Sequence, residues 1–237
     1  MSKRAVILAG GLGMRLRPYT TVLPKPLMPV GEYPILEVVI RQLAKYGFTH
    51  ITLAVNHQAD IIKAYFQEGL RWGVKIDYSL ENTPLGTMGP LRLIPDLPDN
   101  FLVMNGDILT DLNFASLYED HVKASNNFTI SSVKREQRID YGVLEVSEDG
   151  KLSGFKEKPS VFYQVSMGIN MLNKKVLDYI PLNKPYGFDN LMLDLLRAKT
   201  PAAVRVFSGY WLDIGRPDDY ERAIEEFDSL KVKLLNG

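Results

Sequence analysis

The chain has 237 residues, 46% of them hydrophobic, and its 28 basic and 28 acidic residues give a formal net charge of zero. A chain of this size buries a sizeable core, and we expect one domain over residues 1–237. The balanced charge excludes a global field that would gather nucleic acid or an anionic membrane. Neither is expected as a partner, so any anion must be bound by a local site.

The sequence contains no cysteine and no apolar run approaching the roughly 18 residues that span a membrane. Disulfides, thiolate zinc sites and cysteine nucleophiles are therefore excluded. We expect neither a membrane-spanning helix nor a secretory leader, and a cytoplasmic location follows as the default. His50, His57 and His121 lie far apart without ligand spacing, which favours surface or packing roles over metal binding.

The first predicted element is a short buried strand that runs into a glycine-rich turn. Residues 5–8 are consecutively apolar, which suits a strand covered on both faces. Gly10, Gly11 and Gly13 follow at once. Because they lack Cβ atoms, a ligand can approach the backbone N–H groups closely, as phosphate-binding loops require.

The sequence around this turn argues against two better-known phosphate loops. A Walker loop needs Gly-Lys-Ser/Thr after four spacer residues, and no such tripeptide follows. A dinucleotide fingerprint needs a third glycine where this chain has Leu16, and Pro18 and Pro24 lie where its long helix would run. What remains is a glycine loop followed by two cations, Arg15 and Lys25. A plain glycine turn beside two surface cations is the alternative.

The chain next alternates helices and strands. Apolar spacing predicts a helix over residues 34–47, a buried strand over 51–55, a helix with an apolar face over 61–66, and a strand near 75–79. This order of elements implies a parallel sheet with right-handed crossovers.

A second glycine-containing loop follows that strand. Gly86 and Gly89 flank Thr87, and ligands of open parallel sheets bind beyond the carboxyl ends of the strands. We therefore expect the two glycine loops to meet, although an ordinary strand-to-helix loop is the alternative.

The next strand ends in a carboxylate. The apolar residues 101–104 run straight into Asn105, Gly106 and Asp107. A carboxylate at the end of a central strand is well placed to hold a hard cation such as Mg²⁺. Asp107 is therefore the first candidate metal ligand, and a turn-forming aspartate beside a glycine is the alternative.

Further elements complete the α/β pattern. Asn113 is expected to cap a helix, strands are predicted over residues 128–133 and 203–207, and helices over 191–196 and 217–230.

Between these elements the pattern changes to one of antiparallel strands. Residues 141–146 alternate as a half-exposed strand, Asp149-Gly150 is a hairpin signal, and 152–155 form the returning strand. A small antiparallel lobe is therefore expected. The exposed apolar residues 161–165 leave a homo-oligomer open as an alternative to a monomer.

Five separated motifs together resemble the sugar-1-phosphate nucleotidyltransferases, also called nucleoside-diphosphate-sugar pyrophosphorylases. They are GGLGMRL with the following PKPL, LGTMG, EKP, MGIN and WLDIG, between about residues 4 and 223. The resemblance implies an α/β fold with a Rossmann-like, mostly parallel mixed sheet between helices and a small antiparallel sugar-binding lobe. It also implies a nucleotide-binding half of about 1–133 and a sugar-binding half of about 134–237.

The reaction implied by this resemblance is nucleotidyl transfer from a nucleoside triphosphate to a sugar 1-phosphate, with Mg²⁺ as cofactor and pyrophosphate as leaving group. The implied catalytic residues are Arg15, Lys25, Asp107 and Lys158, and the implied metal ligands are Asp107 and Asp213. The implied nucleotide-binding residues are Leu8, Ala9, Gly10, Gly11, Gly13, Met14, Arg15, Glu81, Pro84, Gly86, Thr87 and Asp107. The implied sugar-phosphate-binding residues are Asn105, Gly142, Glu157, Lys158, Asn170 and Trp211.

Several alternatives remain open at this point. Glu157 to Pro159 also fits a charged turn, Trp211 a core residue and Asp213 a turn residue. The resemblance implies that Glu81 reads the edge of the base, and its acceptor oxygens suit the N1–H and N2–H₂ edge of guanine, which makes GTP the favoured nucleotide. The loop and chain length also resemble mannose- and heptose-1-phosphate guanylyltransferases, but relatives that use UTP or dTTP with glucose 1-phosphate carry similar loops. A catalytically silent nucleotide-sugar-binding subunit and a transferase for another phosphorylated acceptor are further alternatives. We expect no carboxyl-terminal β-helical domain.

Overall fold

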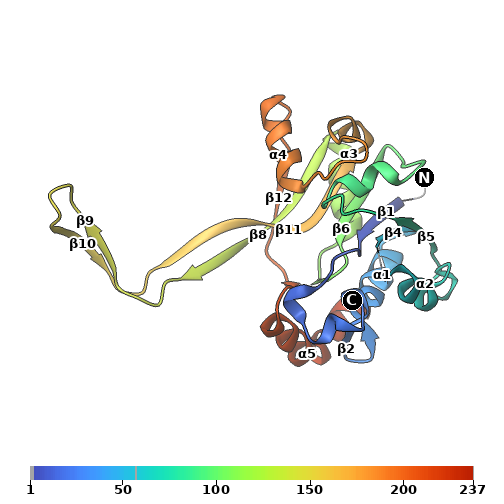
Figure 1. The fold of residues 1–237 in the computed structure, drawn as a ribbon, viewed down its shortest axis with the longest axis horizontal. Coiled ribbons are helices and arrows are strands. Elements are labelled where there is room, and N and C mark those ends of the chain that lie inside the picture. The colour runs from blue at the N-terminus through green and yellow to red at the C-terminus, as the bar shows by residue number, and fades with distance from the viewer. Residues whose placement is uncertain (1–2, 57, 237) are drawn as a thin grey trace.

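A mixed sheet between helices forms the body of the molecule, and a long two-stranded arm projects from it (Figure 1). The computed structural model describes residues 3–56 and 58–236, so the expectation for His57 lies outside the described residues. The predicted α/β class with a mostly parallel mixed sheet is confirmed.

The central sheet has seven strands among the described residues, in the order β12-β8-β11-β6-β1-β4-β5. Their bounds are β1 (Lys3–Leu8), β4 (Phe48–Val55), β5 (Lys75–Leu80), β6 (Asn100–Asn105), β8 (Phe128–Arg138), β11 (Ser160–Asn173) and β12 (Ala203–Phe207). The pairs of β1 with β4, β1 with β6, β4 with β5, and β8 with β12 are parallel. β11 runs antiparallel to both β6 and β8.

Helices cover both faces of this sheet, which explains why its inner strands are continuously apolar. The helices are α1 (Ile35–Lys45), α2 (Ala59–Phe66), α3 (Phe114–Lys123), α4 (Phe188–Arg197) and α5 (Pro217–Lys231). Ile7 on β1 belongs to the core that α1, α2 and α3 cover, whereas its neighbour Val6 belongs to the core that α4 covers. α5 encloses a third core with residues of α1, including Val38.

Short elements connect and brace these layers. The short strands are β2 (Pro29–Val30), β3 (Tyr33–Pro34), β7 (Ile108–Thr110), β9 (Val143–Val146), β10 (Leu152–Lys156) and β13 (Trp211–Asp213). Single 3₁₀ segments occupy Met14–Leu16, Tyr19–Thr21, Lys25–Leu27, Leu70–Trp72, Gly89–Leu93 and Lys174–Tyr179, and a π-helical turn occupies Val232–Asn236. In the described part of the chain, no helix combines the length and apolar character needed to cross a membrane.

The predicted elements are present, with two differences. Asn113 caps α3 as expected, its Oδ1 accepting from the Ser116 N–H at 2.9 Å. The predicted apolar face of α2 is wrong in part, because Ile62 is buried whereas Ile61 and Tyr65 are 43% and 37% exposed. Consecutive helical residues point about 100° apart, so residues 61 and 62 cannot share one narrow buried stripe.

The second difference concerns the expected antiparallel lobe, which is an arm rather than a lobe packed on the body. β8 was expected to end at residue 133 but continues to Arg138, where it pairs with Ser160 of β11. The hairpin of β9 and β10 extends beyond these strands (Figure 1). A bulge in β11 marks the base of the arm, where the pairing shifts between Ser166 and Asn170.

Candidate active site

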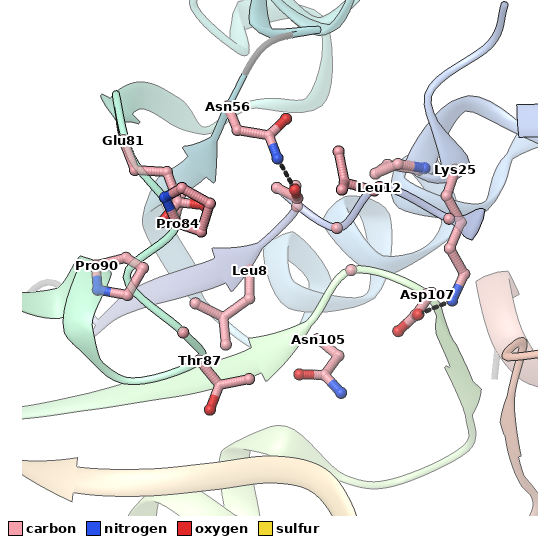
Figure 2. Close-up of a pocket in the computed structure, with 18 of the residues that line it drawn as sticks. Leu8, Leu12, Lys25, Asn56, Glu81, Pro84, Thr87, Pro90, Asn105 and Asp107 are labelled. Atoms are coloured by element: carbon pink, nitrogen blue, oxygen red, sulfur yellow. Dashed lines mark hydrogen bonds and ion pairs between the residues drawn. The ribbon is translucent and has the colours of Figure 1, made fainter. Parts of the chain in front are cut away.

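A cleft of about 750 Å³ lies at the carboxyl ends of the parallel strands (Figure 2). It is lined by Leu8 at the end of β1, Asn56 after β4, Glu81 after β5, and Asn105 and Asp107 at the end of β6. Crevices at these strand ends are the usual ligand sites of open α/β sheets.

Every residue predicted to bind the nucleotide lines this cleft: Leu8, Ala9, Gly10, Gly11, Gly13, Met14, Arg15, Glu81, Pro84, Gly86, Thr87 and Asp107. Lys25 and Asn105 line it as well. The sequence interpretation missed Asn56, whose Nδ2 donates to the Gly10 carbonyl (Figure 2). Asn56 directly follows a buried strand, as Asn105 does, and that position is the signal that points to it.

The first glycine loop depends on close backbone approach. Gly13 has φ +60°, and a Cβ there would lie 2.8 Å from Cγ2 of Thr20, whose hydroxyl donates to the Gly13 carbonyl at 2.7 Å. A Cβ on Gly10 would lie 3.1 Å from Oε1 of Glu81. The two glycine loops therefore meet, with Glu81 beside Gly10.

The second glycine loop is held by the backbone that precedes α4. Gly86 has φ +77°, and a Cβ there would lie 2.8 Å from the carbonyl oxygen of Tyr186. That oxygen accepts from the N–H groups of Met88 at 3.0 Å and Gly89 at 3.1 Å. Met88 is buried in the core under α4. These contacts fix the loop that lines the base of the cleft.

Thr87 belongs both to the cleft and to the framework around it. Its hydroxyl oxygen accepts from the Phe188 N–H at 2.8 Å, at the start of α4. The residue therefore ties the cleft lining to a helix of the body and also satisfies one of the free N–H groups of that helix.

Charged groups gather at the end of the cleft near the first loop. Lys25 Nζ forms an ion pair with Asp107 Oδ2 (Figure 2), while Asp107 Oδ1 is buried without a hydrogen-bond partner. β7 and β13 pair antiparallel and bring Asp213 alongside, with the Ile214 N–H donating to the Asp107 carbonyl at 3.1 Å. Arg15 lies beside Gly215 at the same end.

The carboxylates influence one another at this point. Burial first, and then the negative charge of Asp107, raise the pKa of Asp213, whereas Lys25 and Arg15 act in the opposite direction. Among the described residues, no group of three or more histidines and acids gathers as a metal site. Two carboxylates with one unpartnered buried oxygen nevertheless fit Mg²⁺, which commonly takes one or two carboxylates and completes its shell with phosphate oxygens and water.

A smaller cleft of about 210 Å³ adjoins the first and shares Leu8, Thr87 and Asn105 with it. Its lining includes Asn170, whose buried Oδ1 has no hydrogen-bond partner. Gly168 lies in the bulge of β11 with φ +70°, and a Cβ there would lie 2.7 Å from Nδ2 of Asn105. The bulge therefore brings β11 close to Asn105 and forms one wall of this second cleft.

Trp211 lines neither cleft. Its Nε1–H donates to the Met167 carbonyl at 3.0 Å, and its ring is partly buried against the core. In this position the side chain braces the bulged part of β11.

Three of the predicted sugar-phosphate residues lie in the arm and line neither cleft. Gly142 lies against the Phe155 ring, since a Cβ at Gly142 would be 2.6 Å from it, and 3.3 Å from Glu157 Oε2. Lys158 is exposed, with φ +43°, in the turn before β11. The structure brings Gly142 and Glu157 together, next to Lys158, within the arm. The arm itself projects from the body (Figure 1).

Comparison with known proteins connects this arrangement to a family. The family described as nucleotidyl transferase matches residues 4–229. A probable mannose-1-phosphate guanylyltransferase 1 of Oryza sativa subsp. japonica is 36% identical over 97% of this chain and 66% of its own length. A UTP–glucose-1-phosphate uridylyltransferase of Synechocystis sp. is 34% identical over 97% of this chain and 64% of its own length. The chain thus spans just under two thirds of the length of these two relatives.

Solved structures give the same picture of the fold. HddC from Yersinia pseudotuberculosis, in a structure complexed with GMP-PN, is 29% identical with a TM-score of 0.72, over 95% of this chain and 99% of that one. A putative glucose-1-phosphate thymidylyltransferase from Bacillus anthracis has a TM-score of 0.75 at 23% identity, over 94% of each chain. The second of these likenesses concerns the fold alone.

Proposed function

The chain belongs to the nucleotidyl transferase family, and from that premise we propose that it transfers a nucleotidyl group from a nucleoside triphosphate to a sugar 1-phosphate. The phosphate oxygen of the sugar attacks the α-phosphorus, the bond from the α-phosphorus to the bridging oxygen breaks, and pyrophosphate leaves. The observation that supports this proposal most directly is the meeting of a glycine loop, Lys25 and Asp107 at one end of the first cleft, with Asp213 of the adjoining second cleft close enough to Asp107 to feel its charge.

The cleft residues have distinct tasks in this reaction. The free backbone around Gly10 and Gly11 binds the triphosphate, and the guanidinium of Arg15 stabilises the departing pyrophosphate through its forked N–H donors. Lys25 lies next to Asp107 and contacts the α-phosphate in this proposal. Positive charge placed there before the reaction stabilises the charge that develops in the transition state.

Asp107 and Asp213 would hold Mg²⁺, which supplies positive charge to the triphosphate when it is bound. The orphaned Oδ1 of Asp107 is the acceptor that remains available while Oδ2 pairs with Lys25. Because these carboxylates repel each other in a partly buried site, a bound cation would also relieve their repulsion.

The acceptor enters through the second cleft in this proposal. Asn105 borders both clefts. The unpartnered Oδ1 of Asn170 can accept a hydrogen bond from a hydroxyl of the sugar phosphate. A sugar phosphate is already ionised near neutral pH, so the reaction requires no general base and no protein nucleophile.

GTP is the nucleotide that we favour. Glu81 Oε2 accepts from the Leu85 N–H at 3.2 Å, which holds the carboxylate at the end of the cleft with Oε1 towards Gly10. Such an acceptor suits the donor edge of guanine. The rice relative is named a guanylyltransferase, and the HddC complex contains GMP-PN. The Synechocystis relative supports the alternative, UTP with glucose 1-phosphate.

Pyrophosphate release with Mg²⁺ tests the proposal directly. GTP, UTP, dTTP, CTP and ATP would each be combined with mannose, glucose and heptose 1-phosphates. Release with one pair identifies both substrates, and GTP with a hexose or heptose phosphate is the expected pair. If no pair of substrates releases pyrophosphate although the protein still binds nucleotides, the transferase proposal is contradicted and a nucleotide-sugar-binding regulatory subunit is favoured.

A single substitution tests the base preference. Glu81→Gln exchanges one acceptor oxygen for an N–H₂ donor, so we expect GTP use to fall by about 5- to 150-fold, the usual range for one bidentate base-edge contact. An unchanged ratio of GTP to UTP use would show that Glu81 does not read the base.

The wider setting is also part of the proposal. Residues 1–237 act as one domain, in which about 1–133 bind the nucleotide and about 134–237 bind the sugar phosphate. The protein works in the cytoplasm on these two small molecules, without nucleic acid or membrane as a partner.

A further inference from the structure

The arm carries Glu157 and Lys158 away from the cleft of its own chain. Ser166 lines the second cleft at the base of β11, and the extended strand then runs outward to Ser160. At about 3.3 Å per residue, Ser160 lies roughly 20 Å from Ser166, and Lys158 lies beyond it. This separation far exceeds the length of a lysine side chain, and Figure 1 shows the arm extending away from the body.

The cleft, in turn, lacks what the arm holds. No described residue that lines the second cleft is a lysine or an arginine. Arg15 and Lys25 lie in the first cleft, and Lys25 is already paired with Asp107. An anionic sugar phosphate that enters beside Asn105 and Asn170 therefore meets no unpaired cation of its own chain in this second cleft.

The arm also exposes apolar side chains that its own chain leaves uncovered. Leu144, Val146, Leu152 and Phe155 of the hairpin are 60%, 62%, 64% and 57% exposed. A two-stranded hairpin is marginally stable by itself in water, and contiguous exposed apolar side chains mark an interaction surface. Further down the arm, Phe162 is 53% exposed.

The turn that holds Lys158 is nevertheless well defined. Lys158 adopts a left-handed backbone conformation, which non-glycine residues rarely take. The Ile139 N–H donates to the Pro159 carbonyl at 3.0 Å and ties the turn to the opposite strand. The arm therefore presents its lysine in a fixed geometry, as a residue that contacts a ligand requires.

From these observations we infer that the arm completes the active site of a second copy of this chain. The inference rests on the proposed function. In a two-fold symmetric dimer each body receives the arm of its partner, so that Lys158 contacts the sugar phosphate and Glu157 the sugar hydroxyls. The second copy is the occupant that matches the need, because every chain contains one cleft without a cation and one arm with a cation. Two-fold symmetry satisfies both at once.

Complementation between two inactive variants tests this exchange. Lys158→Ala removes the proposed phosphate contact of the arm, and Asp107→Asn removes a proposed metal ligand of the body. If arms are exchanged, a mixed dimer contains one site with an intact body and an intact arm. Co-expression of equal amounts should then restore about a quarter of the wild-type turnover, because half of the dimers are mixed and each has one working site. Turnover no higher than that of the separate variants would overturn the inference.

The controls separate this inference from the proposed function. Lys156→Ala removes a lysine of the same arm that pairs with Glu145 at 2.6 Å, and it should leave turnover unchanged. If Lys158→Ala by itself retains full turnover, Lys158 does not bind the substrate, and the inference fails while the proposed reaction stands. If the wild-type protein is inactive with all substrates, the proposed function fails, and the following measurement still decides the role of the arm.

That measurement is the mass of the protein in solution. Replacing residues 139–159 by Asn-Gly joins the paired residues Arg138 and Ser160 through a two-residue hairpin turn. We expect the full chain to be a dimer by light scattering and the shortened chain a monomer that still unfolds in one cooperative transition. Leu144→Ser with Phe155→Ser keeps the arm and should also weaken the dimer. A monomeric full chain, or a shortened chain that remains dimeric, would overturn the inference.

Discussion

The body and the arm share two strands but place them in opposite environments. In the body, β11 is buried from Ile169 to Leu172, between β6 and β8. Beyond the bulge the same strand has only β8 beside it, and the side chains of residues 160–164 are exposed. A strand in the body is stabilised by both faces and both neighbours, whereas a strand in the arm has one neighbour. The arm is therefore the part of the chain that needs a partner.

Charges differ between the two regions in the same way. Lys25 and Asp107 pair in the body with side chains only 12% and 19% exposed, whereas Lys156 and Glu145 in the arm are 63% and 51% exposed. Exposed pairs contribute little to stability, because water and salt screen the two charges. Loss of one partner of a buried pair costs more, because the remaining charge is left without compensation. The body thus contains a preformed site, and the arm contributes groups that act once they are covered.

The largest expected effect tests the preformed site. Lys25→Ala and Asp107→Asn should each lower turnover at saturating substrate by about a hundredfold or more, in line with other preorganised transition-state contacts. Pyrophosphate release measures the effect, with Lys123→Ala on the exposed end of α3 as the matched control. Near-normal turnover in both cleft variants would remove these residues from the mechanism.

The next effect distinguishes the arm from the body. Lys158→Ala should lower turnover by about 10- to 100-fold, the equivalent of one lost hydrogen bond to a charged group. Nucleotide affinity should stay unchanged, because the first cleft lies in the body. Titration calorimetry with GTP and steady-state kinetics provide the two readouts. A loss of nucleotide affinity equal to the loss of turnover would contradict this division of tasks.

A third prediction concerns the stability of the body at low pH. Burial lowers the pKa of His121 to about 4, and its Nδ1 lies 2.8 Å from the hydroxyl of Thr129. An unfolded histidine has a pKa of about 6.5, so between these values the unfolded chain binds a proton that the folded chain does not. The free energy of unfolding should therefore fall by about 3 kcal/mol as the pH drops from about 6.5 to 4.

Urea unfolding of the wild type and of His121→Gln at several pH values checks this slope. The variant loses the titrating group, so its stability should depend less steeply on pH over the same range. Parallel curves for the two proteins would show that His121 is not responsible. Because His121 lies on the buried face of α3 and is 1% exposed, the arm should make no difference, and the shortened chain should show the wild-type slope.

The smallest expected effect concerns the glycine loop. Gly13→Ala places a Cβ 2.8 Å from Thr20 Cγ2 at φ +60°, and it should lower the free energy of unfolding by about 1–3 kcal/mol. At Gly11 a Cβ meets nothing within 4 Å, so Gly11→Ala should unfold within about 1 kcal/mol of the wild type. Equal stabilities of the two variants in urea would show that the loop is not strained at Gly13.

The sequence alone indicated much of the cleft. Short apolar runs such as residues 101–104 identified the strands. Residues shortly after these runs, such as Asp107, identified the lining of the cleft. This inference works because parallel strands end at the same edge of the sheet. The same rule applied to the strand that ends at Val55 would have included Asn56, which was missed.

The extent of the arm was not predictable in that way. Residues 134–138 are polar and charged, and neither their composition nor a period shows that β8 continues through them. Their strand conformation depends on the pairing with residues 160–164 of β11. Pairing between distant segments is a tertiary event that local propensity does not specify.

The sequence by itself determined where the chain ends its buried strands and where it allows close backbone approach, because apolar runs and glycines act locally. The tertiary structure alone decided which of these ends meet. It placed Asp213 beside Asp107 through the pairing of β7 with β13, and it separated Lys158 from the cleft by the length of the arm. Both outcomes depend on hydrogen bonds between remote strands, and no single segment carries that information.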